Sequence, residues 1–396
     1  MKKQLMAVSL LAGTAIGSGM ISLPIVLANF GIVWSFALMV FLCWLSYASA
    51  MIRCDLNINS RADFSLKDVG IFFGDKVSGV IGDVALKVLA FALLSAYIFG
   101  GASVLRAFLN IDTESFACVA FVFVGVILFM FLFLSEAIIK INKHVFIVLF
   151  STIMIGVIAL AMCSKVDAIP SATEEICHLK AWSIVFPIVF TSFGFHTALH
   201  SLTKFADNNR ALVRKACIFG SLVPAVVYTL WTICILVVIF NSDPEGFSKM
   251  LAKPIEVSEL ISILSAITKV DFVQHAVWGI SFFAILTSIF GVGLALSELL
   301  SNDLKKRISN KKQLHITSTL VAIIPSAAVA VIVPNAFIRV LNFAGITFAL
   351  MSTIIPVILY ARMKKSKLEC FETLKLFVVF VTGLVIILFG ISDLMQ

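Results

Sequence analysis

Long apolar runs separated by short polar segments dominate the chain. A helix needs about 20 predominantly apolar residues to cross the ~30 Å hydrocarbon core of a membrane. Eleven runs approach or exceed this length, at approximately 5–29, 32–54, 79–109, 116–135, 144–164, 181–203, 214–240, 271–300, 315–333, 335–360 and 373–393. The pattern predicts an all-α integral membrane protein with about eleven transmembrane helices in a single domain, 1–396.

The composition supports this class. Apolar residues make up 61% of the 396 positions and charged residues 13%, with a mean hydropathy of +1.09. A soluble domain carries about 25% charged residues, so this chain could not cover a water-facing surface. The formal net charge of +8 would suit a nucleic-acid partner, but the basic residues cluster in short segments between apolar runs. We therefore expect the lipid bilayer, and no nucleic acid, as a partner.

Lys and Arg gather on alternate sides of the predicted helices. Most of them lie at the N-terminus and in the loops 54–78, 136–143, 204–214, 301–314 and 361–372. Cytoplasmic loops of membrane proteins carry the excess of basic residues, so the N-terminus is predicted to be cytoplasmic. Eleven crossings then place the C-terminus on the other side, which is the periplasm for a bacterial inner membrane.

Segment 241–270 is the longest loop on the outer side. Its residues Val257, Leu260, Ile261 and Leu264 recur at helical spacing between polar residues, which predicts a short amphipathic helix. Two roles are open for this helix: it lies on the lipid headgroups, or it caps an outer vestibule.

Eight cysteines show no metal-ligand spacing, so no metal site is expected. Most fall inside apolar runs, where a free cysteine behaves as a small hydrophobe. Cys163 and Cys177 flank an outer loop, and a disulfide between them is left open.

The first apolar run contains a cluster of helix-weakening residues. Gly13, Gly17 and Gly19 lie in its middle, and the run ends near Pro24. Each glycine costs a helix about 1 kcal/mol relative to alanine. One interpretation is close helix packing through Gly13-x-x-x-Gly17. The other is an unwound segment that offers free backbone groups to a ligand.

The sixth run has a comparable interruption. Thr191, Ser192, Gly194 and His196 fall within apolar sequence that follows Pro187. An ionisable residue at such depth is a functional candidate, although a histidine satisfied by a neighbouring hydroxyl is the plain alternative for His196.

The two interruptions occupy corresponding positions, first and sixth, in two sets of five runs. Paired broken helices are typical of transporters built from inverted repeats, with the substrate site between the breaks. This predicts a five-helix repeat over 5–164, a second over 181–360, and an extra helix over 373–393. Half-helix N-termini would face a substrate carboxylate, and unwound carbonyls would hold an amine or a cation.

The eighth run adds neighbouring hydroxyls at Thr287 and Ser288, and Glu298 follows near its cytoplasmic end. Such hydroxyls often bond back to their own helix. They are also the hard oxygen ligands that a small cation prefers.

Taken together, these stretches resemble the hydroxy and aromatic amino acid permeases, a bacterial branch of the amino acid–polyamine–organocation superfamily with the leucine-transporter fold. The resemblance covers essentially the whole chain, and within the family it is greatest to the tyrosine and tryptophan permeases. The stretches that carry it are Gly13-Thr14-Ala15-Ile16-Gly17-Ser18-Gly19-Met20 with Leu23-Pro24, Phe190-Thr191-Ser192-Phe193-Gly194-Phe195-His196, Ser288-Ile289-Phe290-Gly291-Val292-Gly293-Leu294-Ala295-Leu296 and Val333-Pro334-Asn335-Ala336-Phe337.

The resemblance implies proton-driven uptake of an aromatic amino acid, with no cofactor and no catalytic residue. The substrate-binding residues that it implies are Thr14, Ala15, Gly17, Ser18, Gly19, Tyr97, Thr191, Ser192, Phe193, Phe195 and His196. The candidate ion-coupling residues are Gly13, Ile16, Ala284, Thr287, Ser288 and Glu298. Tyr97 would form an aromatic wall of the pocket, with simple packing as its alternative.

Two features depart from the family pattern. Relatives carry a lysine in the fifth helix that could replace a cation, whereas this chain has Leu149 there. The coupling ion is therefore open between H⁺ and Na⁺. The sequence Thr197-Ala198-Leu199-His200 also replaces the small residues and proline common in relatives, which leaves the preferred amino acid open.

A serine or threonine permease of the same family is the nearest alternative. An intramembrane enzyme would need a clustered catalytic set, and a channel would show pore helices or charged rings. The sequence shows neither pattern, and it leaves the oligomeric state open.

Overall fold

The computed structural model describes residues 2–17, 19–60, 65–109, 111, 116–163, 167–207, 209–252, 255–268, 271–333, 336–364 and 369–395. These residues form helices and connecting turns, with no strand among them. Ten helical stretches of this described part are long and apolar enough to cross a membrane, and Met6–Ala15 is a shorter apolar helix. The prediction of a multi-pass helical membrane protein is confirmed.

The first crossing is made of two short helices, α1 (Lys2–Ala15) and α2 (Gly19–Leu27). A 3₁₀ turn, Ala28–Phe30, leads into α3 (Gly31–Asn59), which is the second crossing. The stretch Gly19–Asn59 has 41 residues, about 60 Å at the helical rise of 1.5 Å per residue, so it is too long for one crossing of a ~30 Å membrane core.

The chain turns between α2 and α3 at Gly31. Its φ of 59° lies in the left-handed region, and a Cβ there would lie 2.5 Å from the backbone of Ser171. Segment 170–173 is bonded to this turn, because Thr173 donates its backbone N–H to the carbonyl of Asn29 at 3.0 Å. Glycine therefore makes both the turn and the close approach possible.

The other crossings of the first half are α5 (Lys76–Phe108), α6 (Phe116–Phe133) and α7 (Ser135–Cys163). The second half begins with another divided helix, α8 (Leu179–Ser192) followed by a 3₁₀ turn, His196–Ala198, and α9 (Leu199–Phe205). It continues through α10 (Arg210–Ser242), α13 (Asp271–Leu304) and α14 (Lys311–Ile332).

The tenth crossing joins α15 (Ala336–Ala349) to α16 (Ile355–Lys364) through a π-helical turn, Leu350–Ile354, and α17 (Cys370–Leu394) is the last. With each divided helix counted once, the described residues make the eleven predicted crossings. The division into two five-helix repeats stays a prediction.

Two loop predictions differ from the structure. The predicted loop 136–143 is helical, because α7 begins at Ser135 and Leu134 is the only residue between α6 and α7 that is not helical. Polar residues there continue the helix, since helical hydrogen bonding does not require apolar side chains.

The predicted loop 54–78 contains the end of α3 and a further helix, α4 (Leu66–Phe72). Ser65 and Asp68 form a capping box at the start of α4. The hydropathy pattern missed this helix because capping residues are polar. After α4, Asp75 accepts the backbone N–H of Ser78 at 3.0 Å and pairs with Arg362 of α16, also at 3.0 Å. These contacts hold the pKa of the Asp75 carboxyl below its ordinary value, and the hydrogen bond from the Ser78 N–H has the largest effect.

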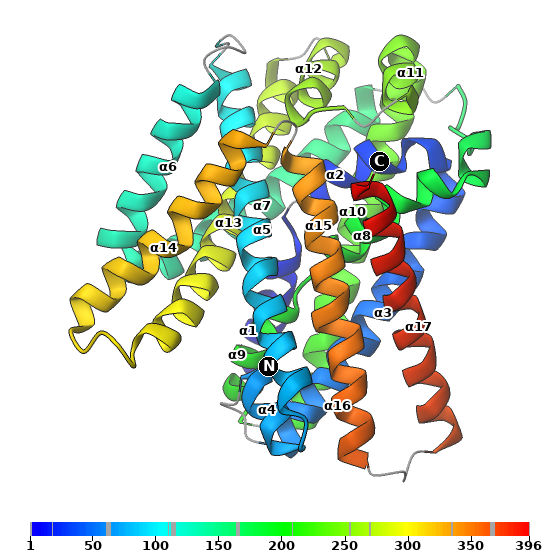
Figure 1. The fold of residues 1–396 in the computed structure, drawn as a ribbon. Coiled ribbons are helices and arrows are strands. Elements are labelled where there is room, and N and C mark those ends of the chain that lie inside the picture. The colour runs from blue at the N-terminus through cyan, green and yellow to red at the C-terminus, as the bar shows by residue number, and fades with distance from the viewer. Residues whose placement is uncertain are drawn as a thin grey trace.

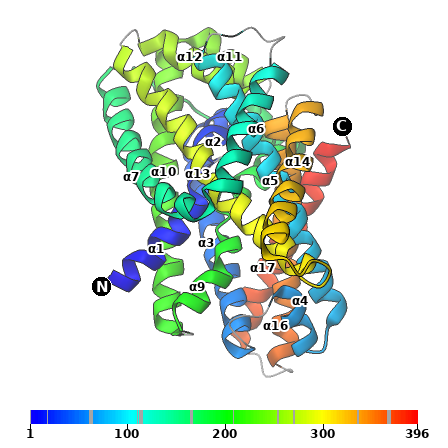
Figure 2. The same ribbon diagram turned by 90° about the vertical axis from the view of Figure 1, so that its left-hand side faces the viewer.

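The loop 241–270 contains two helices, α11 (Pro244–Ala252) and the expected amphipathic α12 (Val257–Thr268). Figures 1 and 2 show α11 and α12 at one end of the bundle and α4 and α16 at the other. The apolar residues Val257, Leu260, Ile261 and Leu264 are buried in the main core. The apolar face of α12 thus packs against the main core of the protein.

Candidate functional site

The first helix is interrupted inside the bundle. Helix α1 ends at Ala15, α2 begins at Gly19, and Ile16 and Gly17 between them are buried and not helical. The interruption leaves the first N–H groups of α2 without the partners of a continuous helix, and the N–H of Met20 donates instead to the carbonyl of Gly17 at 3.1 Å. The predicted unwound segment is therefore present. Its member Ser18 lies outside the described residues.

The sixth crossing is interrupted at a comparable place. Helix α8 ends at Ser192, and Phe193, Gly194 and Phe195 form a non-helical link to the 3₁₀ turn at His196. The hydroxyls of Thr191 and Ser192 bond back to the carbonyls of Pro187 and Ile188, at 2.7 and 2.9 Å. These two side chains thus satisfy their own helix, and the carbonyls of Ser192 and Phe193 at this break lie within hydrogen-bond distance of side chains from other helices.

Tyr228 of α10 joins the two interruptions. Its hydroxyl donates to the carbonyl of Ala15 at 2.6 Å, lies 3.1 Å from the carbonyl of Ser192, and accepts the N–H of Gly17 at 3.4 Å. The tyrosine is fully buried. A single hydroxyl therefore holds the end of α1 beside the end of α8.

Gly19 is required by the same tyrosine. A Cβ on Gly19 would lie 2.6 Å from Cζ and 2.8 Å from the hydroxyl oxygen of Tyr228. Real Cβ contacts do not approach this closely, so α2 packs on the ring only with glycine at this position. A Cβ on Gly17 would instead collide with the hydroxyl of Ser288.

Two further side chains stabilise the breaks. Trp231, one turn after Tyr228 on α10, donates its indole N–H to the carbonyl of Met20. Ser46 of α3 donates to the carbonyl of Phe193 at 2.8 Å. None of Tyr228, Trp231 and Ser46 was among the predicted site residues. The available signal was a tyrosine, one of 4 in the chain, in the middle of the seventh apolar run.

His196 lies beside the second break and is buried, with 5% of its surface exposed. Its Nε2 is 2.9 Å from the hydroxyl of Ser49 on α3. Its Nδ1 is buried and has no hydrogen-bond partner among the described residues. The ring stacks on Phe195 and meets Phe348 of α15 edge-on, with centroids 5.1 and 5.0 Å apart. Thus Ser49 satisfies one nitrogen, as the packing interpretation requires, and the other remains available.

The candidate ion-coupling residues separate into two groups. Thr287 and Ser288 of α13 both donate to the carbonyl of Ala284, at 3.0 and 2.9 Å, and Ser288 packs against Gly17 at the first break. Glu298 is exposed and lies ten residues further along α13, about 15 Å away at the helical rise. The structure therefore brings the two hydroxyls to the break and leaves Glu298 apart.

The remaining predicted residues lie around this centre. Tyr97 of α5 is buried and within electrostatic reach of Tyr228. Phe193 meets the Tyr228 ring edge-on at 5.7 Å. Gly13 and Thr14 are half-buried near the end of α1, and the ring of Phe146 on α7 lies 3.5 Å from where a Gly13 Cβ would be. Phe195 belongs to a smaller cluster with α9 and the start of α10.

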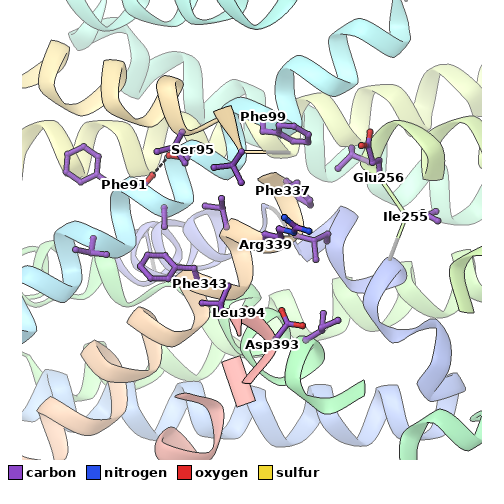
Figure 3. Close-up of a pocket in the computed structure, with 18 of the residues that line it drawn as sticks. Phe91, Ser95, Phe99, Ile255, Glu256, Phe337, Arg339, Phe343, Asp393 and Leu394 are labelled. Carbon is purple, nitrogen blue, oxygen red and sulfur yellow. Dashed lines mark hydrogen bonds between the residues drawn. The ribbon is translucent and has the colours of Figure 1, made fainter. Parts of the chain in front are cut away.

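A cavity of about 870 Å³ at the end of the bundle that carries α12 lies apart from these residues, and its lining includes none of the predicted site residues. Figure 3 shows Arg339 of α15, Glu256 just before α12, and Asp393 near the end of α17 around this space. Val257, the first residue of α12, also lines it. The amphipathic helix thus begins at the edge of this cavity.

Cys177 is exposed and is a free cysteine in the structure. The side chain of Cys163 is outside the described part of the structure. No cluster of three or more His, Cys, Asp or Glu residues that could hold a metal occurs within that part.

The described residues make eleven helical crossings, and the first and sixth are broken and joined through one hydroxyl, which defines a multi-pass helical membrane protein with paired broken helices. Residues 1–394 match the tryptophan/tyrosine permease family. The chain belongs to this family, and the resemblance drawn from its motifs is confirmed.

Named relatives show the range of the family. The chain is 29% identical to tyrosine-specific transport system 1 of Haemophilus influenzae, covering 92% of this chain and 90% of the relative. It is 24% identical to the low affinity tryptophan permease of Escherichia coli O157:H7, over 90% of this chain and 86% of that permease. It is also 26% identical to glutamine transporter 2 of Aliivibrio fischeri, over 91% and 89%.

The fold is similar to the crystal structure of a manganese transporter from Eremococcus coleocola, with a TM-score of 0.62 and 15% identity over 98% of this chain and 87% of that chain. This similarity concerns the fold alone, and it confirms the leucine-transporter-like arrangement.

Proposed function

We propose that this protein is a secondary transporter that carries an aromatic amino acid, such as tyrosine or tryptophan, into the cell with a coupled cation. The observation that carries the proposal is the pair of broken helices held together by Tyr228. The start of α2 offers N–H groups and the end of α8 offers carbonyls. Their partial charges are opposite in sign, so they suit the carboxylate and the ammonium group of an amino acid.

Aromatic rings surround this centre. Phe190 and Phe348 lie 4.6 Å apart between centroids, and Phe193 packs on Tyr228. Aromatic side chains prefer offset and edge contacts with one another, which supports an aromatic substrate. The named tyrosine and tryptophan carriers among the relatives favour the same class. Glutamine is the competing substrate, because one relative is a glutamine transporter.

The experiment is competition uptake in liposomes, with labelled tyrosine and each of the twenty amino acids as competitor. Tyrosine, tryptophan or phenylalanine should inhibit at concentrations at least about tenfold below the other amino acids, which corresponds to ~1.4 kcal/mol of preference. Counterflow against unlabelled substrate identifies a carrier, since neither a channel nor an enzyme exchanges solute in this way. Strongest inhibition by glutamine or serine would refute the aromatic assignment.

His196 is the residue through which we propose that uptake depends on pH. A histidine can take up and release a proton during transport, and Nδ1 of His196 has no hydrogen-bond partner among the described residues. His196→Ala should abolish uptake or flatten its dependence on pH between 5.5 and 8. His178, exposed at the start of α8, provides the control, because His178→Ala should leave the pH profile unchanged. An unchanged profile and affinity in His196→Ala would show that His196 only packs.

For the coupling ion we favour H⁺ over Na⁺. The position at which relatives carry a lysine holds Leu149, which is fully buried on α7, so no side-chain cation replaces a bound ion there. Sodium therefore remains the alternative. Its ligands would be the hydroxyls of Thr287 and Ser288, the carbonyl of Ala284, and carbonyls near Gly13 and Ile16.

The double variant Thr287→Val with Ser288→Ala distinguishes the two ions. It removes both hydroxyls and nearly preserves their shape. Under proton coupling, the variant should still take up substrate when a pH gradient is imposed. Under sodium coupling, any stimulation of uptake by sodium should disappear. Wild-type uptake that ignores sodium and collapses with a protonophore would exclude the sodium cage.

We place the protein in a bacterial inner membrane with its N-terminus in the cytoplasm. The basic residues of the predicted inner loops support this orientation, because positive charge is retained on the cytoplasmic side. The end of the bundle that carries α4 and α16 is then the inner end (Figure 1).

A further inference from the structure

A second cavity, of about 1070 Å³, opens between α3, α10, α16 and α17. It lies near the end of α3, the start of α10 and the start of α17, which is the end of the bundle that carries α4 and α16 (Figures 1 and 2). It includes none of the predicted site residues, so substrate binding does not account for it.

The charges around this cavity do not balance. Its two acidic residues are each paired: Asp55 with Arg210 at 2.9 Å, and Glu372 with Lys364 at 3.2 Å. Three other basic residues line the cavity, and none of them forms an ion pair with a described residue; they are Arg214, Lys215 and Lys375.

The lining of this cavity carries a net positive charge. Arg210, Arg214, Lys215 and Lys375 line it together with only two carboxylates, those of Asp55 and Glu372. Positive charges that outnumber the carboxylates in one cavity favour a bound anion, because the anion relieves their mutual repulsion.

The walls of the same cavity are apolar and open outward. Trp44, Ile218 and Leu374 line it, with 41%, 37% and 58% of their surfaces exposed. Further exposed apolar residues continue from it along the three helices: Val40 on α3, Leu222 on α10 and Phe377 on α17. On membrane-spanning helices such faces meet lipid chains, so the basic end of the cavity continues into an acyl-chain surface.

We propose that this cavity binds an anionic glycerophospholipid. The phosphate lies against Arg214, Lys215 and Lys375, and the acyl chains run along α3, α10 and α17 between the exposed apolar residues. Basic pockets between membrane helices on the cytoplasmic side bind anionic headgroups in this manner. The open apolar faces favour a lipid over a free phosphate, because a free phosphate has no apolar chains that could contact them.

Native mass spectrometry of the detergent-solubilised protein tests the proposal with phosphatidylglycerol and phosphatidylcholine. The wild type should bind phosphatidylglycerol at least about tenfold more tightly. The triple variant Arg214→Gln, Lys215→Gln, Lys375→Gln should lose this preference. The matched control is Lys306→Gln, Lys311→Gln, Lys312→Gln, which removes three exposed positive charges from the α13–α14 connection and should retain the preference.

A measurement on the wild type avoids dependence on how the variant folds. Phosphatidylglycerol with brominated chains should quench tryptophan fluorescence more than brominated phosphatidylcholine, and Trp44→Phe should remove the difference. Equal binding of the two lipids, or tight binding by the triple variant, would overturn the proposal. Full displacement of the lipid by millimolar inorganic phosphate would replace the lipid site with a simple anion site.

Discussion

Gly19→Ala is expected to reduce uptake at least about tenfold, and Gly19→Leu to abolish it, while both variants still insert into the membrane. The added Cβ would lie 2.6 Å from Cζ of Tyr228, so the ring or α2 must move. Overpacking of this kind costs about 1–3 kcal/mol, and ~1.4 kcal/mol is a factor of ten in an equilibrium. The measurement is initial uptake rate per amount of protein in the membrane.

Gly125 of α6 gives the control for this experiment. It is a helical glycine, and nothing lies within 4 Å of the position that its Cβ would occupy. Gly125→Ala should therefore transport as the wild type does. Gly17→Leu should behave like Gly19→Leu, because its side chain would collide with Ser288. Normal uptake by Gly17→Leu and Gly19→Ala would reduce these glycines to packing residues and remove the proposed site.

Tyr228→Phe is expected to lower uptake by about tenfold to a hundredfold. The substitution removes one oxygen and leaves the ring in place, so the carbonyls of Ala15 and Ser192 lose their shared partner. An unsatisfied buried polar group costs about 1–3 kcal/mol. Uptake should fall because the two breaks are less well ordered without this hydroxyl. Uptake measured against substrate concentration should therefore show weaker apparent affinity.

Tyr360 provides the matched removal of a hydroxyl. Its oxygen lies 3.3 Å from Glu372 at the start of α17, far along the chain from either break. Tyr360→Phe should keep uptake within about twofold of the wild type, because its hydroxyl contacts neither break and Glu372 keeps its ion pair with Lys364. If Tyr228→Phe transported equally well, the hydroxyl would not organise the site, and Trp231 and Ser46 alone would have to hold the breaks.

Local sequence determined the membrane class, the crossings and the positions of both breaks. Hydropathy predicts each crossing because a membrane helix satisfies its backbone within itself and exposes its side chains to lipid. The breaks follow from local chemistry as well. Gly17 and Gly19, and Gly194 after Pro187, weaken the helix where they stand, whatever packs around them.

The contacts that make those breaks into a site were decided by the tertiary structure. Tyr228 is more than 200 residues from Ala15 in the chain, and no local pattern specifies which buried tyrosine meets which free carbonyl. The same holds for Ser49 beside His196 and for Ser288 beside Gly17. Sequence could identify backbone groups that had lost their helical partners, because that loss is local. Their new partners come from distant helices, and only packing brings those helices together.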